Sequence, residues 1–236
     1  MKIRANGIDI EIEDSAHGQP PRASQPVVLL ILFVVAGTLA TGVLQVLQLG
    51  ELRWIPAGNP GHRGAPLADA SLRLEMVRAA TADQRGFVVD DREVRRTGVT
   101  YTVDTLGELR REFPHRPLCL VLGMDAFLGF ESWHRWQAVL EHAHLVVAHR
   151  PGWQAPQTGP LASLLESRAV KEIADLHATL AGRIRVQAVT QLEIASSDLR
   201  AIITSGRDPR FLVPDAVCEI IRRTQCYARS QQSRPT

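Results

Sequence analysis

The sequence predicts an α/β fold, a doubly wound parallel sheet of the Rossmann-like type. Two observations lead to this prediction: short apolar segments recur along the chain, and segments with the period of an amphipathic helix lie between them. Strands that alternate with helices form right-handed βαβ units, so helices cover both faces of a parallel sheet. The predicted strands span residues 27–35, 52–55, 87–89, 118–122, 145–148 and 184–188. The predicted helices span residues 39–49, 70–81, 102–113, 125–143, 196–204 and 214–224.

The chain opens on a predicted β-hairpin. Isoleucines at positions 3, 8, 10 and 12 flank Asn6-Gly7, a pair typical of two-residue hairpin turns. Residues 15–26 hold three prolines and are predicted to be a linker. We therefore expect a hairpin and linker extension over residues 1–26, one domain over 27–228, and a frayed tail over 229–236.

The first strand of that domain lies in an uncharged stretch, residues 23–50. Uncharged apolar runs longer than about 18 residues are candidates for membrane spans. The other interpretation is a buried parallel strand followed by a turn and a helix. We favour burial in a sheet because glycine, threonine and glutamine residues interrupt the run after Ala36.

The predicted parallel strands are expected to form a crevice at one edge of the sheet. Parallel strands end at the same edge of the sheet, and nucleotide-like ligands bind there at the switch point. Residues 151–160 hold three prolines and two glycines, which predict a long loop.

Composition limits the possible functions. The chain has 236 residues, 45% of them hydrophobic, which suffices for a buried core. Its 27 Lys and Arg nearly balance 25 Asp and Glu, so the net charge of +2 predicts no general attraction to nucleic acid. Cys119, Cys218 and Cys226 are widely spaced, which favours free thiols in a reducing cytoplasm over a structural metal site.

Common catalytic motifs are missing from the sequence. It holds no G-x-S-x-G nucleophile motif, and residues 37–42 are not followed by the Lys-Ser/Thr of a Walker A loop. His142, His144 and His149 flank a strand, and no carboxylate is placed with them, so we interpret them as structural or solvated rather than as metal ligands.

Two segments are candidate anion sites. Ser196 and Ser197 precede a predicted helix whose free N–H groups, together with Arg200, suit phosphate, although Ser-Ser is also an ordinary cap. A Gly- and Pro-rich loop ends in His62 and Arg63, which suit phosphate or form a plain surface turn. Trp133 and Trp136 are core residues, or one of them is a platform for a flat ring.

Several motifs, in order, resemble the bacterial nicotinate-mononucleotide adenylyltransferase family. The resemblance covers about residues 32 to 227. The matching segments are residues 51–58, 60–63, 91–94, 100–106, 122–125, 133, 143–145, 149–152 and 194–200.

The resemblance implies a nucleotidyltransferase fold in a cytoplasmic enzyme of NAD biosynthesis. Members join nicotinate mononucleotide to ATP with Mg²⁺, giving nicotinate adenine dinucleotide and pyrophosphate. The substrate phosphate attacks the α-phosphorus of ATP in line, so the protein positions its substrates and neutralises charge. The implied partners are therefore these two nucleotides, with no nucleic acid and no membrane.

The resemblance also implies site residues. ATP is expected to bind Gly37, Thr38, Ser196, Ser197 and Arg200. Trp133 is expected to stack on the pyridine ring, in a pocket lined by Thr102 and Asp125. Basic positions near the mononucleotide or the triphosphate are His62, Arg63 and Arg150.

The start of the domain departs from the family. The family motif G-G-[ST]-F-D-P-x-H-x-G-H is represented only by Gly37 and Thr38, and both histidines are absent, so the catalytic residues are unknown. Loss of such donors typically costs about 10²–10³ in rate each. The segment before it resembles the opening of an α/β-hydrolase. The alternative function is therefore a non-catalytic nucleotide-binding remnant or a chimeric product, with the apolar run buried in a partner or a bilayer.

Overall fold

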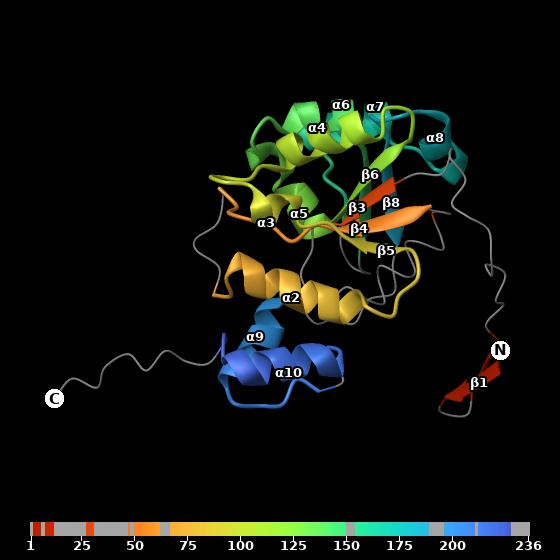
Figure 1. Cartoon of the computed structure of the whole chain (residues 1–236). Coiled ribbons are helices and arrows are strands. Elements are labelled where there is room, and N and C mark those ends of the chain that lie inside the picture. Colours follow the sequence, from red (N-terminus) through yellow and green to blue (C-terminus); the bar gives the residue numbers. More distant parts are fainter. Residues whose placement is uncertain are drawn as a thin grey trace.

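The computed structural model describes residues 2–5, 8–11, 27–30, 47, 50–61, 67–149, 154–188, 196–210 and 212–227. Within these ranges a parallel sheet has the strand order β5-β4-β3-β6-β7-β8 (Figure 1). Its strands are β3 (Val27–Leu30), β4 (Glu51–Trp54), β5 (Phe87–Val89), β6 (Leu118–Gly123), β7 (His144–His149) and β8 (Ile184–Ala188). The chain leaves the centre of the sheet in one direction through β4 and β5, and in the other through β7 and β8. This order confirms the doubly wound prediction.

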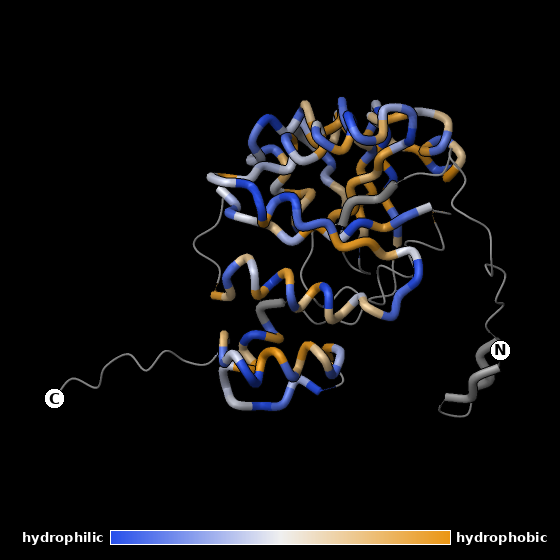
Figure 2. Tube along the Cα trace, viewed as in Figure 1, coloured by the Kyte–Doolittle hydropathy of each residue, from blue (hydrophilic) through white to orange (hydrophobic). Residues whose placement is uncertain are grey.

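Side chains of the central strands alternate between two cores, as expected for strands buried on both faces. In β6, Leu118, Leu120 and Leu122 pack in one cluster with Val103 and Leu106, whereas Cys119 and Val121 face the other. Figure 2 shows hydrophobic residues along these strands and mixed hydropathy along the helices. The apolar runs that predicted the strands therefore reflect burial on both faces.

Helices form a layer on each side of the sheet (Figure 1). One side carries α4 (Thr102–Glu112), α6 (Trp136–His142) and α7 (Pro160–Arg168). The other carries α2 (Ala70–Thr81), on which α9 (Ser196–Thr204) and α10 (Asp215–Thr224) pack through a third hydrophobic cluster. Thus α2 lies between the sheet and the C-terminal helices.

Most predicted elements agree with the structure. Helix α2 has the predicted bounds, and its N-cap Asp69 accepts a 2.8 Å hydrogen bond from the Leu72 amide. The N-terminal hairpin is present as β1 (Lys2–Ala5) and β2 (Ile8–Glu11), which form a separate two-stranded sheet. Of the predicted strand 27–35, residues 27–30 are described as β3. The predicted helix 39–49 lies outside the described residues except for Leu47, which is buried.

The single helix predicted over residues 125–143 is wrong. The structure has three short elements there: α5 (Met124–Leu128), the 3₁₀ helix η1 (Phe130–Ser132) and α6. The chain turns at Gly129, and Arg135 has a left-handed backbone with φ of 50°, so the helical hydrogen bonds are interrupted twice. Helices α3 (Arg92–Arg95), α7 and α8 (Ile173–Ala178) were not predicted.

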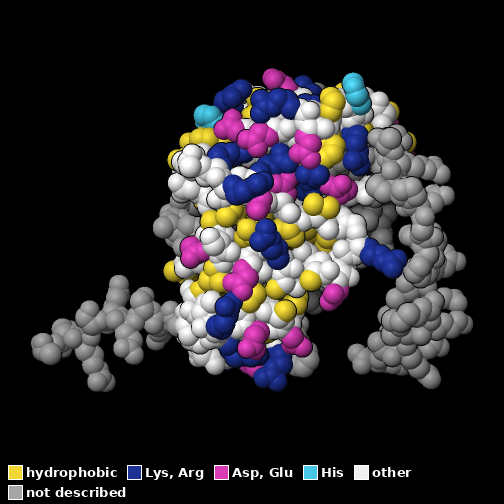
Figure 3. All heavy atoms as spheres, viewed as in Figure 1, with side chains coloured by type: hydrophobic (Ala, Val, Ile, Leu, Met, Phe, Trp, Pro, Cys, Tyr) yellow, Lys and Arg dark blue, Asp and Glu magenta, His cyan; other side chains and the backbone are white. Residues whose placement is uncertain are grey.

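The surface carries mixed charge. Figure 3 shows Lys and Arg interspersed with Asp and Glu over the visible face, in keeping with the small net charge. No helix within the described residues combines the length and the hydropathy needed to cross a bilayer.

Candidate active site

The switch point of the sheet lies between β3 and β6, because the two halves of the sheet diverge there. Ligands of doubly wound folds bind outside the carboxyl ends of the strands at this point. All strands of the sheet are parallel, so the segments that follow β4, β6 and β7 leave from this same edge. The candidate site therefore consists of these segments.

The loop after β4 is packed tightly against α3 and the segment before α4. Asn59 accepts a 2.8 Å hydrogen bond from the Thr100 amide, and Pro60 and Thr100 form an isolated parallel bridge. A Cβ atom at Gly58 would lie 2.0 Å from the Glu93 carbonyl oxygen, so only glycine fits there. The loop is thus held in one position beside the start of α4.

A buried arginine holds the same loop from the other side. Arg73 of α2 donates hydrogen bonds to the carbonyl oxygens of Ala57, Gly58 and Ala68, the latter two at 2.9 and 2.5 Å. Burial lowers the pKa of Arg73, against the opposing effects of Tyr227 and Asp69. Sequence reasoning missed this residue, because nothing in the periodicity of α2 marks one arginine as buried.

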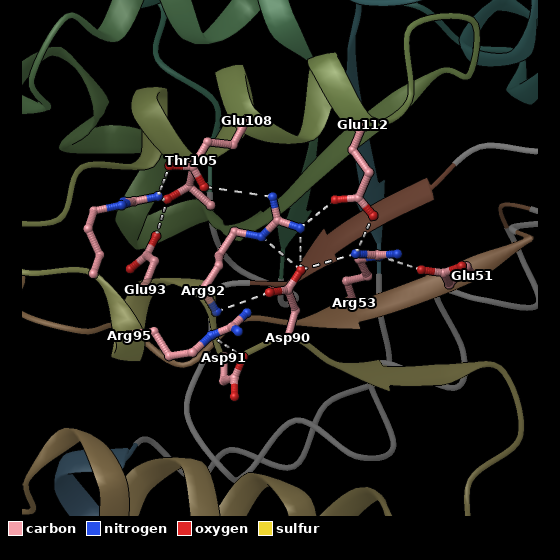
Figure 4. A network of polar contacts seen from close by, with 11 residues as sticks. Glu51, Arg53, Asp90, Asp91, Arg92, Glu93, Arg95, Thr105, Glu108 and Glu112 are labelled. Carbon is pink, nitrogen blue, oxygen red and sulfur yellow. Dashed lines mark hydrogen bonds and ion pairs between the residues drawn. The ribbon is translucent and has the colours of Figure 1, made fainter.

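A network of arginines and carboxylates connects β4, β5, α3 and α4 (Figure 4). Asp90, just after β5, accepts hydrogen bonds from Arg53 at 3.1 Å and from Nε of Arg92 at 2.8 Å. Glu112 of α4 lies 3.0 Å from Arg53 and 2.6 Å from Arg92. Burial acts to raise the pKa of Asp90, but the hydrogen bonds from Arg92 and Arg53 outweigh it and hold the pKa below its usual range.

At the end of this network nearest the loop, Glu93 is buried. It accepts a 2.6 Å hydrogen bond from the Thr105 hydroxyl. Arg96 donates to Thr105 at 3.1 Å and to Glu108 at 2.7 Å. Because the Glu93 carbonyl also packs against Gly58, α3 fixes the loop after β4 relative to α4.

Helix α4 begins at Thr102, one of the predicted pocket residues, which is half-buried. Its N-cap residue is Tyr101, whose side chain makes no capping hydrogen bond within the described chain. An uncapped helix N-terminus has backbone N–H groups and a partial positive charge available to an anion. The start of α4 is therefore suited to a negatively charged group of a ligand.

The segment after β6 contains two predicted site residues. Asp125 is exposed in the first turn of α5, and its carboxylate folds back toward Gly123. Trp133 is half-buried and lies edge-on to Phe130, with ring centroids 5.4 Å apart. Trp136 packs on the same Phe130 ring at 5.7 Å. Both tryptophans thus contact the core through Phe130, which sequence reasoning missed.

The structure brings together the chain neighbours of two predicted residues. The ring of Tyr101, next to Thr102, stacks on His134, next to Trp133. Arg200 is half-buried in α9, and its charge acts on Tyr227. Helix α9 begins at Ser196, as predicted, but the side chains of Ser196 and Ser197 are not described. The other predicted site residues outside the described ranges are Gly37, Thr38, His62, Arg63 and Arg150.

The sequence predicts no metal-binding site, and the structure can be compared with this prediction only over the described residues. Among the residues that the structure describes, no three His, Cys, Asp or Glu side chains gather as a potential ion site. His144 is fully buried, and its ring bonds to the Thr179 carbonyl and the Arg183 amide, as expected for a structural histidine.

The strand order and the segments at the switch point define a class of protein, the α/β proteins of doubly wound topology that bind nucleotide-like ligands at this edge. A family model described as cytidylyltransferase-like matches residues 40–202. A protein of Aeromonas hydrophila named "Probable nicotinate-nucleotide adenylyltransferase" is 45% identical over 181 residues, which are 77% of this chain and 85% of that protein. One of the same name from Methylococcus capsulatus is 42% identical over 191 residues, 80% of this chain and 91% of that protein. The chain belongs to the nicotinate-nucleotide adenylyltransferase family.

Solved structures agree on the fold. A Plasmodium falciparum nicotinic acid mononucleotide adenylyltransferase complexed with NaAD has a TM-score of 0.62 at 15% identity, over 86% of this chain and 97% of that one. The same enzyme complexed with APC has a TM-score of 0.60 over the same shares. This chain therefore has the fold of these nucleotidyltransferases.

Proposed function

We propose that this protein transfers the adenylyl group of ATP to nicotinate mononucleotide. The phosphate oxygen of the mononucleotide attacks the α-phosphorus, the bond to the β-phosphate oxygen breaks, and nicotinate adenine dinucleotide and pyrophosphate leave. The observation that carries the proposal is the 45% identity to a protein named as a probable nicotinate-nucleotide adenylyltransferase, spread over 181 residues that make up 77% of this chain.

The proposed reaction needs no nucleophile from the protein, since one substrate attacks the other. What the protein must supply is a fixed geometry and positive charge near the phosphates. The tightly held loop after β4 and the uncapped start of α4 suit the first requirement. The start of α9, with Arg200 on its first turns, suits the second.

Each substrate has its own proposed contacts. For ATP these are Gly37, Thr38, Ser196, Ser197 and Arg200, with Mg²⁺ entering as the metal complex of the substrate. For the mononucleotide, Trp133 stacks on the pyridine ring, while Thr102 and Asp125 line the pocket. His62, Arg63 and Arg150 supply positive charge to the phosphates.

The boundaries of the extension and the cellular compartment also belong to the proposal. The separate β1–β2 sheet supports an extension over residues 1–26, and β3, which begins at Val27, lies at the centre of the main sheet. All three cysteines are described and are free thiols, which supports a reducing cytoplasm.

One observation favours a second candidate, a nucleotide-binding protein without turnover. Residues 37–42 lack the two histidines that family members carry after the first strand. Such donors stabilise charge on the transferring phosphates, and their loss lowers the rate without removing the binding sites.

The test incubates the purified full chain with ATP, Mg²⁺ and nicotinate mononucleotide and follows pyrophosphate and the dinucleotide. Stoichiometric formation of both products supports the proposed transfer. Calorimetric binding of both nucleotides with no product would replace it by the second candidate. Failure to bind nicotinate mononucleotide would overturn both. Nicotinamide mononucleotide in a parallel reaction, and EDTA in another, measure substrate choice and the need for Mg²⁺.

A further inference from the structure

Two aromatic rings on different segments stack at the edge of the candidate site. The ring centroids of Tyr101 and His134 lie 4.1 Å apart with an interplanar angle of 28°. Tyr101 directly precedes Thr102 at the start of α4, and His134 directly follows Trp133. The stack therefore connects the segment of Thr102 with that of Trp133, two residues that the proposed function assigns to the mononucleotide.

The Tyr101 ring also contacts a third segment. A Cβ atom on Gly61 would lie 3.1 and 3.2 Å from Cε1 and Oη of Tyr101, and 2.5 Å from Val99. The loop after β4 thus packs against the same ring as His134. Tyr101 connects the loop after β4, the start of α4 and the segment after η1.

The segment that carries Trp133 and His134 has little regular structure to hold it. It lies between η1 and α6, and Arg135, its last residue, has a left-handed backbone. On the inner side Trp133 is held by the Phe130 ring. On the outer side the ring of His134 stacks on that of Tyr101.

The exposure of the pair separates it from the core. His134 is exposed and Tyr101 half-buried, whereas Phe130 and Leu106, which belong to the core cluster that Tyr101 packs against, are fully buried. Loss of an exposed ring removes little buried apolar area, so the fold tolerates it. The same loss removes the stacking contact between the Trp133 segment and the start of α4.

We infer that Tyr101 and His134 are a positioning pair, which orients the start of α4 and the Trp133 ring for the mononucleotide. The inference rests on the proposed function. Neither side chain is given a role in the chemical step, and neither is placed near ATP. The contribution that is required of His134 is a flat ring, not a charge or a hydrogen bond.

The experiment compares three variants of the full chain: His134→Ala, His134→Gln and His134→Phe. Calorimetry measures the dissociation constants for nicotinate mononucleotide and for ATP with Mg²⁺ separately. We expect Ala and Gln to weaken mononucleotide binding roughly three- to tenfold, the range that one aromatic pair supplies. Phe keeps the stack and should restore it. ATP affinity should stay unchanged in all three.

Two controls separate positioning from general damage. His115→Ala removes another exposed histidine, in the turn between α4 and β6, and should alter neither constant. In a double-mutant cycle, Tyr101→Leu with His134→Ala should weaken mononucleotide binding no more than Tyr101→Leu alone, because the stack is lost once. Thermal unfolding of each variant verifies the fold.

The outcomes are distinct. If the unsubstituted chain binds no mononucleotide, the proposed function fails. If it binds and His134→Ala binds equally well, or if His134→Phe loses as much as His134→Ala, the inference alone is overturned. An equal loss of ATP affinity would also overturn it, since that result indicates a distorted domain.

Discussion

The hydroxyl of Thr105 donates a 2.6 Å hydrogen bond to the carboxylate of Glu93, and both side chains are buried. This bond joins α4 to α3 at the point where α3 supports the loop after β4. A buried carboxylate that loses a donor bears the cost of its own desolvation. The pair therefore contributes to both the stability of the domain and the geometry of the candidate site.

Thr105→Val is expected to lower the free energy of unfolding by about 1–3 kcal/mol, because it keeps the shape of the side chain but removes the donor to Glu93. Urea unfolding measures the change. Thr81→Val is the matched control: Thr81 is also buried, but its hydroxyl donates to a neutral helix carbonyl, that of Val77, at 2.8 Å. Equal losses in the two variants would show that Glu93 has no special need of Thr105.

The fold was predictable from the sequence because burial of a sheet on both faces leaves a strong pattern. Runs such as those of β6 and β7 are continuously apolar, and α2 and α9 have the predicted bounds. The segment after β6 was not predictable in this way. Its apolar residues fit a helix, but Gly129 and the left-handed Arg135 interrupt that helix. The spacing of apolar residues does not show where φ becomes positive.

The site was predictable only where motifs mark it. The Ser-Ser-Asp start of α9 and the Thr-Tyr-Thr start of α4 are local signals, and both lie where helices begin. Arg73, Glu93 and Phe130 were missed because their roles depend on contacts with distant segments. Tyr101 lies within the matching segment 100–106, but only its stack on His134 indicates a role.

His144 makes stability depend on pH. Its Nε2 lies 2.9 Å from the Thr179 carbonyl, which must accept, and its Nδ1 accepts from the Arg183 amide at 2.9 Å. The ring is therefore neutral, and burial lowers its pKa, with the Thr179 hydrogen bond opposing. A lowered folded-state pKa means that the unfolded chain takes up the proton first, so stability is lost as pH falls below about 6.5.

We expect the free energy of unfolding to fall below pH 6.5 with a contribution from His144 of at most about 1.4 kcal/mol per pH unit. His144→Gln keeps an amide donor but cannot titrate, so its unfolding free energy should vary less over this range. Urea unfolding at several pH values measures both proteins. An identical pH dependence in the two would rule out His144 as the source.

Gly58→Ala is expected to destabilise the domain by about 1–3 kcal/mol, because the new Cβ would meet the Glu93 carbonyl at 2.0 Å and the backbone must shift. Mononucleotide binding should weaken as well, since the shift moves the loop beside α4. Gly107→Ala, inside α4, places a Cβ atom 3.8 Å from His142 Nε2, an ordinary van der Waals contact, and should instead stabilise by about 0.5–1 kcal/mol. If Gly58→Ala leaves both quantities intact, the loop is not held as described.

Arg135 stores backbone strain beside Trp133, since a non-glycine residue at φ of 50° pays a steric cost of roughly 1 kcal/mol. Arg135→Gly should relieve it, and the stability gained will be partly offset by the greater freedom of glycine in the unfolded chain. Arg135→Val should destabilise, because a branched Cβ fits this conformation poorly. Gln225, at φ of 51° where α10 ends, is the control outside the site. Gln225→Gly should change the free energy of unfolding in the same direction as Arg135→Gly. Only Arg135→Gly should alter the affinity for the mononucleotide, because Arg135 connects the Trp133 segment to α6.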